Sequence, residues 1–126
     1  MTALNRILHV DDDLDILEVS KMVLEVVGDF TIEQCSSGAD ALATVLQFKP
    51  ELILLDAMMP RMSGLEVLQE LQKSPDTANI PVIFMTSKVK PSELEAFTAA
   101  GAIGVITKPF DPVELPDQIK DLWGKL

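Results

Sequence analysis

Residues 52–60 read LILLDAMMP, a run of four large aliphatic residues that ends in an aspartate. A strand with one face in water alternates apolar and polar residues, whereas residues 52–55 offer no polar position on either face. Such a strand is typical of a parallel sheet that is covered by helices on both faces. The stretch therefore predicts an α/β fold, with Asp56 at the carboxyl end of a buried strand.

Further apolar runs extend this pattern along the chain. With residues 52–55 they predict strands at residues 6–10, 30–35, 81–85 and 104–107. Stretches with helical periodicity follow the strands and begin near Leu14, Gly38, Leu65, Glu93 and Pro112. Five βα units in strict alternation predict one doubly wound α/β domain over residues 1–126.

Short polar motifs predict where two of the helices begin. Ser92 with Glu95, and residues 111–114 (DPVE), are typical of helix N-termini. Pro116 lies just past the first turn of the last helix, so we expect a distorted start to that helix.

The composition limits the partners of the chain. Its formal net charge of −10 repels phosphate backbones and anionic lipids, and its ten basic residues are scattered. We therefore expect neither direct nucleic-acid binding nor membrane binding. No apolar run approaches the length of a membrane span, and no signal-peptide core is present, so a cytoplasmic protein is expected. Cys35 is the only cysteine, which excludes an internal disulfide and a cysteine metal cluster.

The first predicted helix carries more apolar residues than one sheet face can bury. Its polar positions form only a narrow strip of Glu18, Lys21 and Glu25. Two interpretations are open. The excess apolar surface packs against the last helix, near Leu122 and Trp123, or it docks a partner protein.

Polar side chains follow several predicted strands at their carboxyl ends, where ligands bind in open parallel sheets. They are Asp11 and Asp12 after the first strand, Asp56 after the third, Thr86 and Ser87 after the fourth, and Thr107 and Lys108 after the fifth. If the first and third strands are neighbours, Asp11, Asp12 and Asp56 share one pocket. Two carboxylates about 4 Å apart repel by roughly 4 kcal/mol at an effective dielectric near 20, so the cluster is costly without a cation. Few carboxylates with room for water suit Mg²⁺.

A calcium loop is excluded in the acidic stretch before the first helix. Asp11, Asp13 and Asp15 imitate the first, third and fifth ligand positions of an EF-hand. Ile16 then stands where that loop requires glycine, and Met22 stands where it requires glutamate.

Asp56 differs from the other acids because it stands alone at a strand end. A carboxylate beside a divalent cation can attack a phosphoryl group and form an acyl phosphate. The Thr86 hydroxyl and the Lys108 ammonium are suited to contact the phosphoryl oxygens. The set predicts phosphoryl transfer to a protein carboxylate.

Four segments, ILHVDDDLDIL, LILLDAMMPRMSGLEVL, PVIFMTS and GVITKPF, resemble the receiver domain of two-component response regulators. The resemblance covers essentially the entire chain, in the order and spacing of that family. It implies a flavodoxin-like (βα)5 fold, related to the chemotaxis receivers, with strand order 2-1-3-4-5.

The resemblance also implies a role for each pocket residue. Asp56 is the phosphoacceptor, and Mg²⁺ is bound by Asp11, Asp12, Asp56 and the backbone carbonyl of Met58. Thr86 is the switch hydroxyl, and Lys108 contacts the phosphoryl group and precedes a cis bond to Pro109. Asp13 and Asp15 have no required role and are interpreted as helix-start acids.

The implied function is a phosphorylation switch that signals through protein contacts. The phosphoryl donor would be a histidine kinase or a histidine phosphotransfer protein, and the downstream target is unknown. The domain would catalyse only its own phosphorylation and dephosphorylation, with no output domain in this chain. Homodimer formation is left open. Met58 and Lys88 are expected to tune the lifetime of the acyl phosphate.

One residue departs from the family pattern. Val105 occupies the position on the fifth strand that usually carries a tyrosine or phenylalanine switch. A valine cannot swing as a ring does, so the signal would leave by the first helix or by the loop at residues 87–91. His9, inside the first strand, is interpreted as a buried core histidine.

Two other functions are compatible with parts of the pattern. Asp11 and Asp13 after the first strand imitate the opening motif of magnesium-dependent phosphatases of the haloacid-dehalogenase type, but that family leaves Asp56 unexplained. A receiver-shaped binding module that never uses phosphate is the other alternative, although such modules usually lack part of the pocket.

Overall fold

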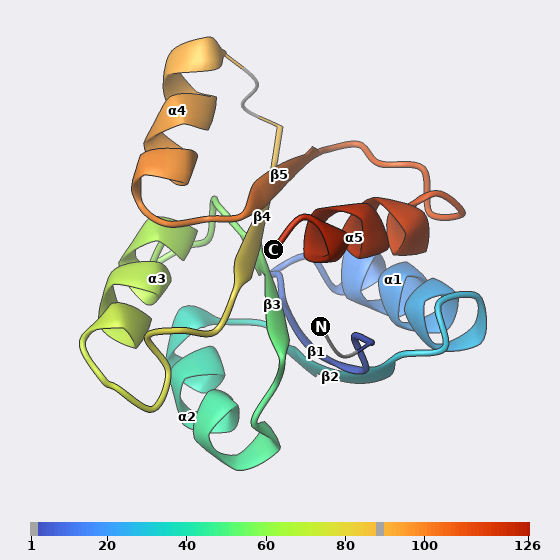
Figure 1. Ribbon diagram of the computed structural model, residues 1–126, viewed down its shortest axis with the longest axis horizontal. Helices are drawn as coiled ribbons and strands as arrows, with labels where there is room; N and C mark the ends of the chain where they lie inside the picture. Colours follow the sequence, from blue (N-terminus) through green and yellow to red (C-terminus); the bar gives the residue numbers. More distant parts are fainter. Residues whose placement is uncertain (1–2, 88–89) are drawn as a thin grey trace.

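The structure is a computed structural model that describes residues 3–87 and 90–126. Its five strands are β1 (Arg6–Val10), β2 (Thr31–Cys35), β3 (Leu52–Asp56), β4 (Val82–Thr86) and β5 (Gly104–Thr107). All adjacent strands pair in parallel, in the order β2-β1-β3-β4-β5 (Figure 1). The predicted flavodoxin-like sheet and its strand order are confirmed.

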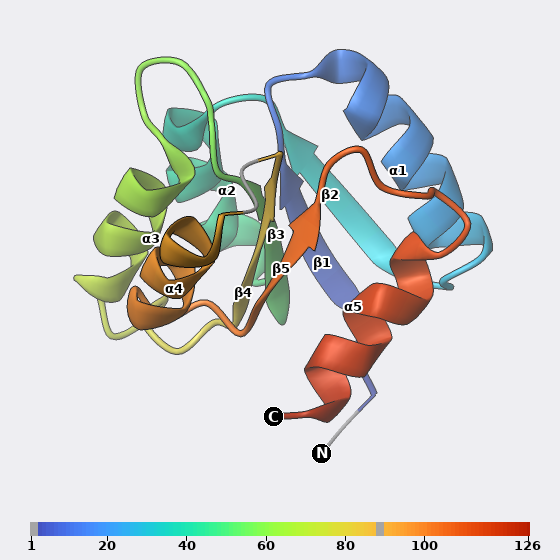
Figure 2. The same ribbon diagram turned by 90° about the horizontal axis from the view of Figure 1, so that it is seen from above.

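Five helices cover the two faces of this sheet. They are α1 (Leu14–Val26), α2 (Gly38–Phe48), α3 (Gly64–Gln72), α4 (Pro91–Ala99) and α5 (Leu115–Gly124). Figure 2 shows α2, α3 and α4 on one side of the sheet, with α1 and α5 on the other. No helix in residues 3–87 or 90–126 is both long and apolar enough to cross a membrane.

Each face of the sheet has its own core. Every residue of β3 and β4 is buried, as the aliphatic run at residues 52–55 predicts. Phe84 and Phe97 belong to the core under α2, α3 and α4. Ile7 and Ile119 belong to the core under α1 and α5. The loops at the carboxyl ends of the strands are thus held by a rigid scaffold.

The helix starts follow local hydrogen-bonding chemistry. The Asp13 carboxylate caps α1 by accepting from the N–H groups of Asp15 and Ile16, in agreement with its interpretation as a helix-start acid. Ser63 and Glu66 form a reciprocal capping box at α3. Such caps satisfy amide groups that have no partner inside the helix.

Two of the predicted helix starts are wrong. The N-cap of α4 is Lys90 rather than Ser92, because Pro91 occupies the first turn, where its missing N–H costs nothing. The DPVE motif at residues 111–114 forms a turn in which Asp111 Oδ1 accepts from the Val113 N–H. α5 begins only at Leu115, so Pro116 lies within its first turn and not just past it. A proline in the first turn removes no helical hydrogen bond, so the expected distortion by Pro116 was wrong as well.

The excess apolar surface of α1 is divided between core and solvent. Leu17 and Leu24 are buried, and α1 packs beside α5, as the first interpretation requires. Met22 and Val26 are nevertheless 60% and 78% exposed, and Val19 is 39% exposed. Since α5 covers only part of the apolar arc, an apolar stripe on α1 stays in contact with water.

Candidate functional site

Three carboxylates meet at the carboxyl end of the sheet because β1 and β3 are neighbours. Asp11 is fully buried, Asp56 is 4% exposed, and Asp12 faces solvent. One carboxylate oxygen from each residue lies within 4.8 Å of the other two. The structure therefore brings the three predicted acids into one pocket.

Lys108 supplies positive charge to this pocket from the end of β5. Its Nζ lies 2.7 Å from Asp11 Oδ2 and 3.2 Å from Asp56 Oδ1. The Lys108 N–H donates to the carbonyl of Thr86 at 2.8 Å, which holds the end of β5 beside the end of β4. The bond from Lys108 to Pro109 is cis, as the resemblance implies.

Burial and charge change the proton affinity of the pocket groups. Burial, together with the negative charge of Asp11, raises the pKa of Asp56 to about 6, even though Lys108 opposes the shift. Burial alone would lower the pKa of Lys108, but its hydrogen bond to Asp11 and the nearby negative charges raise it overall. A further cation would therefore favour the ionised form of Asp56.

The remaining predicted residues surround this centre. Thr86 is buried at the end of β4, the strand next to the one that carries Asp56. Met58 donates its N–H to Asp56 Oδ1 at 3.3 Å, while its side chain is 56% exposed. The role of the Met58 carbonyl stays a prediction, and Lys88 lies outside the described residues.

The donor set fits a magnesium ion. Each of the three acids offers a hard oxygen ligand, and the exposure of Asp12 leaves one side of the pocket open to water. Mg²⁺ prefers oxygen ligands and retains several water molecules, so this arrangement suits it better than a closed, all-protein cage.

His9 lies in the core, as the sequence predicts. It is fully buried, and its Nδ1 lies 3.5 Å from Gln34 Nε2. Burial, with the positive charge of Lys108, lowers the pKa of His9 to about 3, so the ring is neutral near pH 7. Within the described part of the chain, His9 Nε2 and Ser20 Oγ are buried without a hydrogen-bond partner.

Gly64 is a positioning residue that the sequence interpretation missed. A Cβ at this position would lie 2.4 Å from the carbonyl oxygen of Asp56 and 2.9 Å from the Phe84 ring. Its N–H also donates to the Ala57 carbonyl at 3.0 Å. The start of α3 therefore rests directly on the backbone of the acidic pocket. The signal in the sequence was a glycine immediately after the Ser63 cap.

Comparison with known proteins identifies the family. Residues 7–120 match the family described as the response regulator receiver domain. The chain is 38% identical over 114 residues to the phosphate regulon transcriptional regulatory protein PhoB of Pseudomonas aeruginosa, covering 90% of this chain and 49% of that protein. It is 34% identical over 117 residues to the DNA-binding dual master transcriptional regulator RpaA of Synechocystis, covering 93% of this chain and 48% of RpaA.

Solved structures agree with these sequence matches. A response regulator from Desulfuromonas acetoxidans has a TM-score of 0.86 and 34% identity, covering 97% of this chain and 98% of its own. The chemotaxis protein CheY4 of Vibrio cholerae has a TM-score of 0.87 and 27% identity, covering 95% and 99%.

The fold, the acidic pocket and these similarities define a signalling domain of the two-component class. The chain belongs to the response regulator receiver domain family. It spans about half the length of the curated relatives that it matches.

Proposed function

We propose that Asp56 accepts a phosphoryl group from a phosphohistidine of a histidine kinase or a histidine phosphotransfer protein. The supporting observation is the convergence of Asp11, Asp12 and Asp56 within 4.8 Å, with Lys108 at 2.7 and 3.2 Å from two of them. A cluster of this kind is suited to a divalent cation and a phosphoryl group, whose charges compensate each other.

The transfer is a direct displacement at phosphorus. An oxygen of the Asp56 carboxylate forms a bond to phosphorus while the P–N bond of the donor phosphohistidine breaks. The electron pair of that bond stays on the imidazole nitrogen, and an acyl phosphate remains on Asp56. Mg²⁺, when bound, would offset the negative charge of the phosphoryl oxygens.

Each pocket residue has a separate part in this proposal. Asp11, Asp12 and Asp56, with the backbone carbonyl of Met58, would hold the ion. Lys108, already in the pocket, would exchange its contact with Asp56 Oδ1 for a phosphoryl oxygen. The Thr86 hydroxyl would donate a hydrogen bond to another phosphoryl oxygen.

The surface beside the pocket supports a helical phosphodonor. A groove of about 260 Å³ is lined on one side by Ile16 and Val19 of α1 and on the other by Lys108, Phe110 and Pro112. It continues into the exposed apolar stripe of α1. Because Lys108 lies both in the groove and in the pocket, a helix seated here would present its histidine close to Asp56.

The negative charge around the groove favours a positively charged donor surface. Asp12, Asp15 and Glu18 are exposed near the apolar stripe. We infer that the donor helix carries apolar residues flanked by lysine or arginine, which would speed association through electrostatic steering.

The geometry of the pocket disfavours the phosphatase alternative. In that mechanism Asp11 would be the nucleophile. Its Oδ2 is instead ion-paired with Lys108, and its Oδ1 accepts a hydrogen bond from the Asp13 N–H at 2.9 Å, so both oxygens are already engaged. The second acid of that motif, Asp13, is the cap of α1.

Intact-protein mass spectrometry after incubation with acetyl phosphate tests the proposed function. One phosphoryl group should be gained by the wild type with Mg²⁺, and none by Asp56→Ala or without Mg²⁺. If no adduct forms, a beryllofluoride titration distinguishes rapid hydrolysis from a phosphate-independent module. Failure to bind beryllofluoride as well would contradict the proposal.

A further inference from the structure

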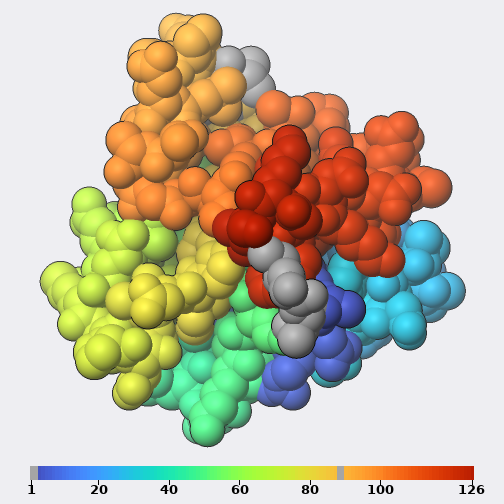
Figure 3. Space-filling model, in the orientation of Figure 1, coloured from blue at the N-terminus to red at the C-terminus, as the bar shows by residue number. Residues whose placement is uncertain are grey.

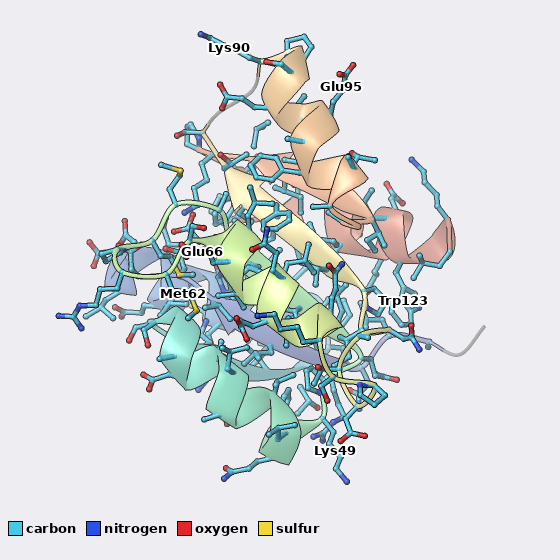
Figure 4. All side chains as sticks on the ribbon, turned by 90° about the vertical axis from the view of Figure 1, so that its left-hand side faces the viewer. Lys49, Met62, Glu66, Lys90, Glu95 and Trp123 are labelled. Atoms are coloured by element: carbon cyan, nitrogen blue, oxygen red, sulfur yellow. The ribbon has the colours of Figure 1, made fainter. Side chains whose placement is uncertain are left out.

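α4 is held to the rest of the domain mainly through one aromatic ring. Of the residues of α4, all of which the structure describes, Phe97 alone is buried. In Figures 1 and 3, α4 stands out from the body of the molecule. Figure 4 shows Lys90 and Glu95 pointing away from the sheet at the outer end of this helix. A helix attached in this way can change its position at little cost in buried surface.

The ring that holds α4 packs on a ring of the central sheet. The centroids of Phe97 and Phe84 lie 4.8 Å apart, and their planes are inclined by 35°. Phe84 is fully buried in β4, two residues before Thr86. The position of α4 is therefore set largely by what surrounds Phe84.

The start of α3 lies close both to Phe84 and to the backbone of Asp56. Gly64, at the start of α3, approaches both the Phe84 ring and the Asp56 carbonyl so closely that no Cβ fits between them. The Gly64 N–H donates to the carbonyl of Ala57 at 3.0 Å. The backbone of Asp56, the start of α3, Phe84 and Phe97 thus form one unbroken line of contacts.

A cleft beside this line leaves room for movement. It measures about 260 Å³ and is lined chiefly by Ala57, Met58 and Leu65 on one side and by Ala96 and Phe97 of α4 on the other. An apolar cavity of about 150 Å³ already accommodates a benzene ring, so the cleft is large enough for the Phe97 side chain. No comparable ring is present on β5, where Val105 is half-buried opposite Phe84.

We propose that the Phe84–Phe97 ring pair couples the state of Asp56 to the position of α4, with the cleft as the space into which α4 moves. A change in the Asp56 backbone shifts Gly64, and Gly64 displaces the Phe84 ring on which Phe97 rests. This coupling rests on the proposed function, and it replaces a route that would require an aromatic residue at Val105.

The test compares amide NMR spectra with and without Mg²⁺ and beryllofluoride, a mimic of the phosphoryl group. The wild type should show shifts in the loop after Asp56 and in α4. In Phe97→Leu, the loop shifts should persist, while the α4 shifts should fall by about half or more. The matched control is Phe48→Leu, which changes a half-buried phenylalanine of α2 on the same side of the sheet and should retain both sets of shifts.

A second variant leaves the ring pair intact. Ala96→Leu fills the cleft from the exposed side of α4, so it should also reduce the α4 shifts without changing the loop shifts. Full α4 shifts in both variants would overturn the coupling, as would a wild type whose loop responds while α4 does not. If the wild-type loop does not respond at all, the phosphoacceptor function itself fails.

Discussion

Lys108 and Asp11, which are 97 residues apart in the sequence, form an ion pair in which Nζ lies 2.7 Å from Oδ2. Asp11 is fully buried, and the side chain of Lys108 is 17% exposed. Lys108 therefore compensates the buried negative charge of Asp11 at the carboxyl end of the sheet. The same ammonium group also lies close to the Asp56 carboxylate.

Removal of this lysine is expected to destabilise the metal-free domain. Breaking a buried pair from one side leaves an unpaired charge, so Lys108→Met should lower the free energy of unfolding by roughly 3 kcal/mol in chelator. Mg²⁺ should restore part of the loss. The control is Lys73→Met, which breaks an exposed pair with Glu70 at 2.8 Å and should cost less than about 0.5 kcal/mol. Urea unfolding measures both, and equal losses would show that Lys108 is not compensating buried charge.

Magnesium is expected to raise the melting temperature because it binds only the folded pocket. Asp12→Asn removes one acid of the cluster, so it should melt higher than the wild type in chelator and no longer respond to millimolar Mg²⁺. Asp13→Asn is the matched control, since asparagine also caps helices and Asp13 lies outside the cluster. An unchanged magnesium response in Asp12→Asn would remove Asp12 from the site.

A methyl group at Gly64 is expected to be costly. Gly64→Ala would place a Cβ 2.4 Å from the Asp56 carbonyl oxygen, which forces a backbone shift and should cost roughly 2–4 kcal/mol of stability. Gly124→Ala meets no atom within 4 Å and should be neutral or stabilising by about 0.5–1 kcal/mol. Thermal unfolding of the two variants decides the point, and an unaffected Gly64→Ala would mean that the start of α3 is not held against the pocket.

The apolar stripe of α1 is expected to affect phosphoryl transfer from a donor protein but not phosphorylation by acetyl phosphate. Met22→Glu should slow phosphoryl transfer from a phosphorylated histidine phosphotransfer protein by about tenfold or more, because a charge would be buried in the interface. Its labelling by acetyl phosphate should stay unchanged. Leu46→Glu, at a similarly exposed leucine of α2, should transfer normally. Equal rates for both variants would place the donor elsewhere on the surface.

His9 and Asp56 are expected to act in opposite directions on stability as the pH falls. The folded-state pKa of His9, about 3, lies below its ordinary value of 6.5, so the unfolded chain takes up the proton first and stability is lost below about pH 6.5. Asp56 has its pKa raised from 3.8 to about 6, so the folded state takes up the proton first and stability is gained between those values.

Two variants separate these contributions in chelator. Asp56→Asn leaves His9 unopposed and should lose roughly 3 kcal/mol more between pH 6.5 and 4.5 than His9→Gln does. Urea unfolding at several pH values measures the difference. If Asp56→Asn loses no stability over this range, His9 is not held neutral by the fold; if His9→Gln gains none, the pKa of Asp56 is not raised.

The regular part of the fold could be predicted because its determinants are local. The aliphatic run at residues 52–55 has no polar face, which is typical of a strand covered on both sides. Helix starts were less predictable. Ser92 and Glu95 have the residue types of a helix cap, but Pro91 is equally suited to the first turn of a helix. The sequence pattern alone does not decide which of these two starts the helix adopts.

The residues of the pocket could be predicted from the sequence, because each of them follows a strand and parallel strands end at the same edge of the sheet. What only the tertiary structure decided are the contacts between distant residues: Lys108 with Asp11, Gly64 against Phe84, and Phe97 on Phe84. The same holds for α1, whose apolar residues are alike in sequence although Leu24 is buried and Val26 is not. Hydrophobic period and caps act within a few residues, whereas ion pairing, close approach and exposure depend on which surfaces the completed fold brings together.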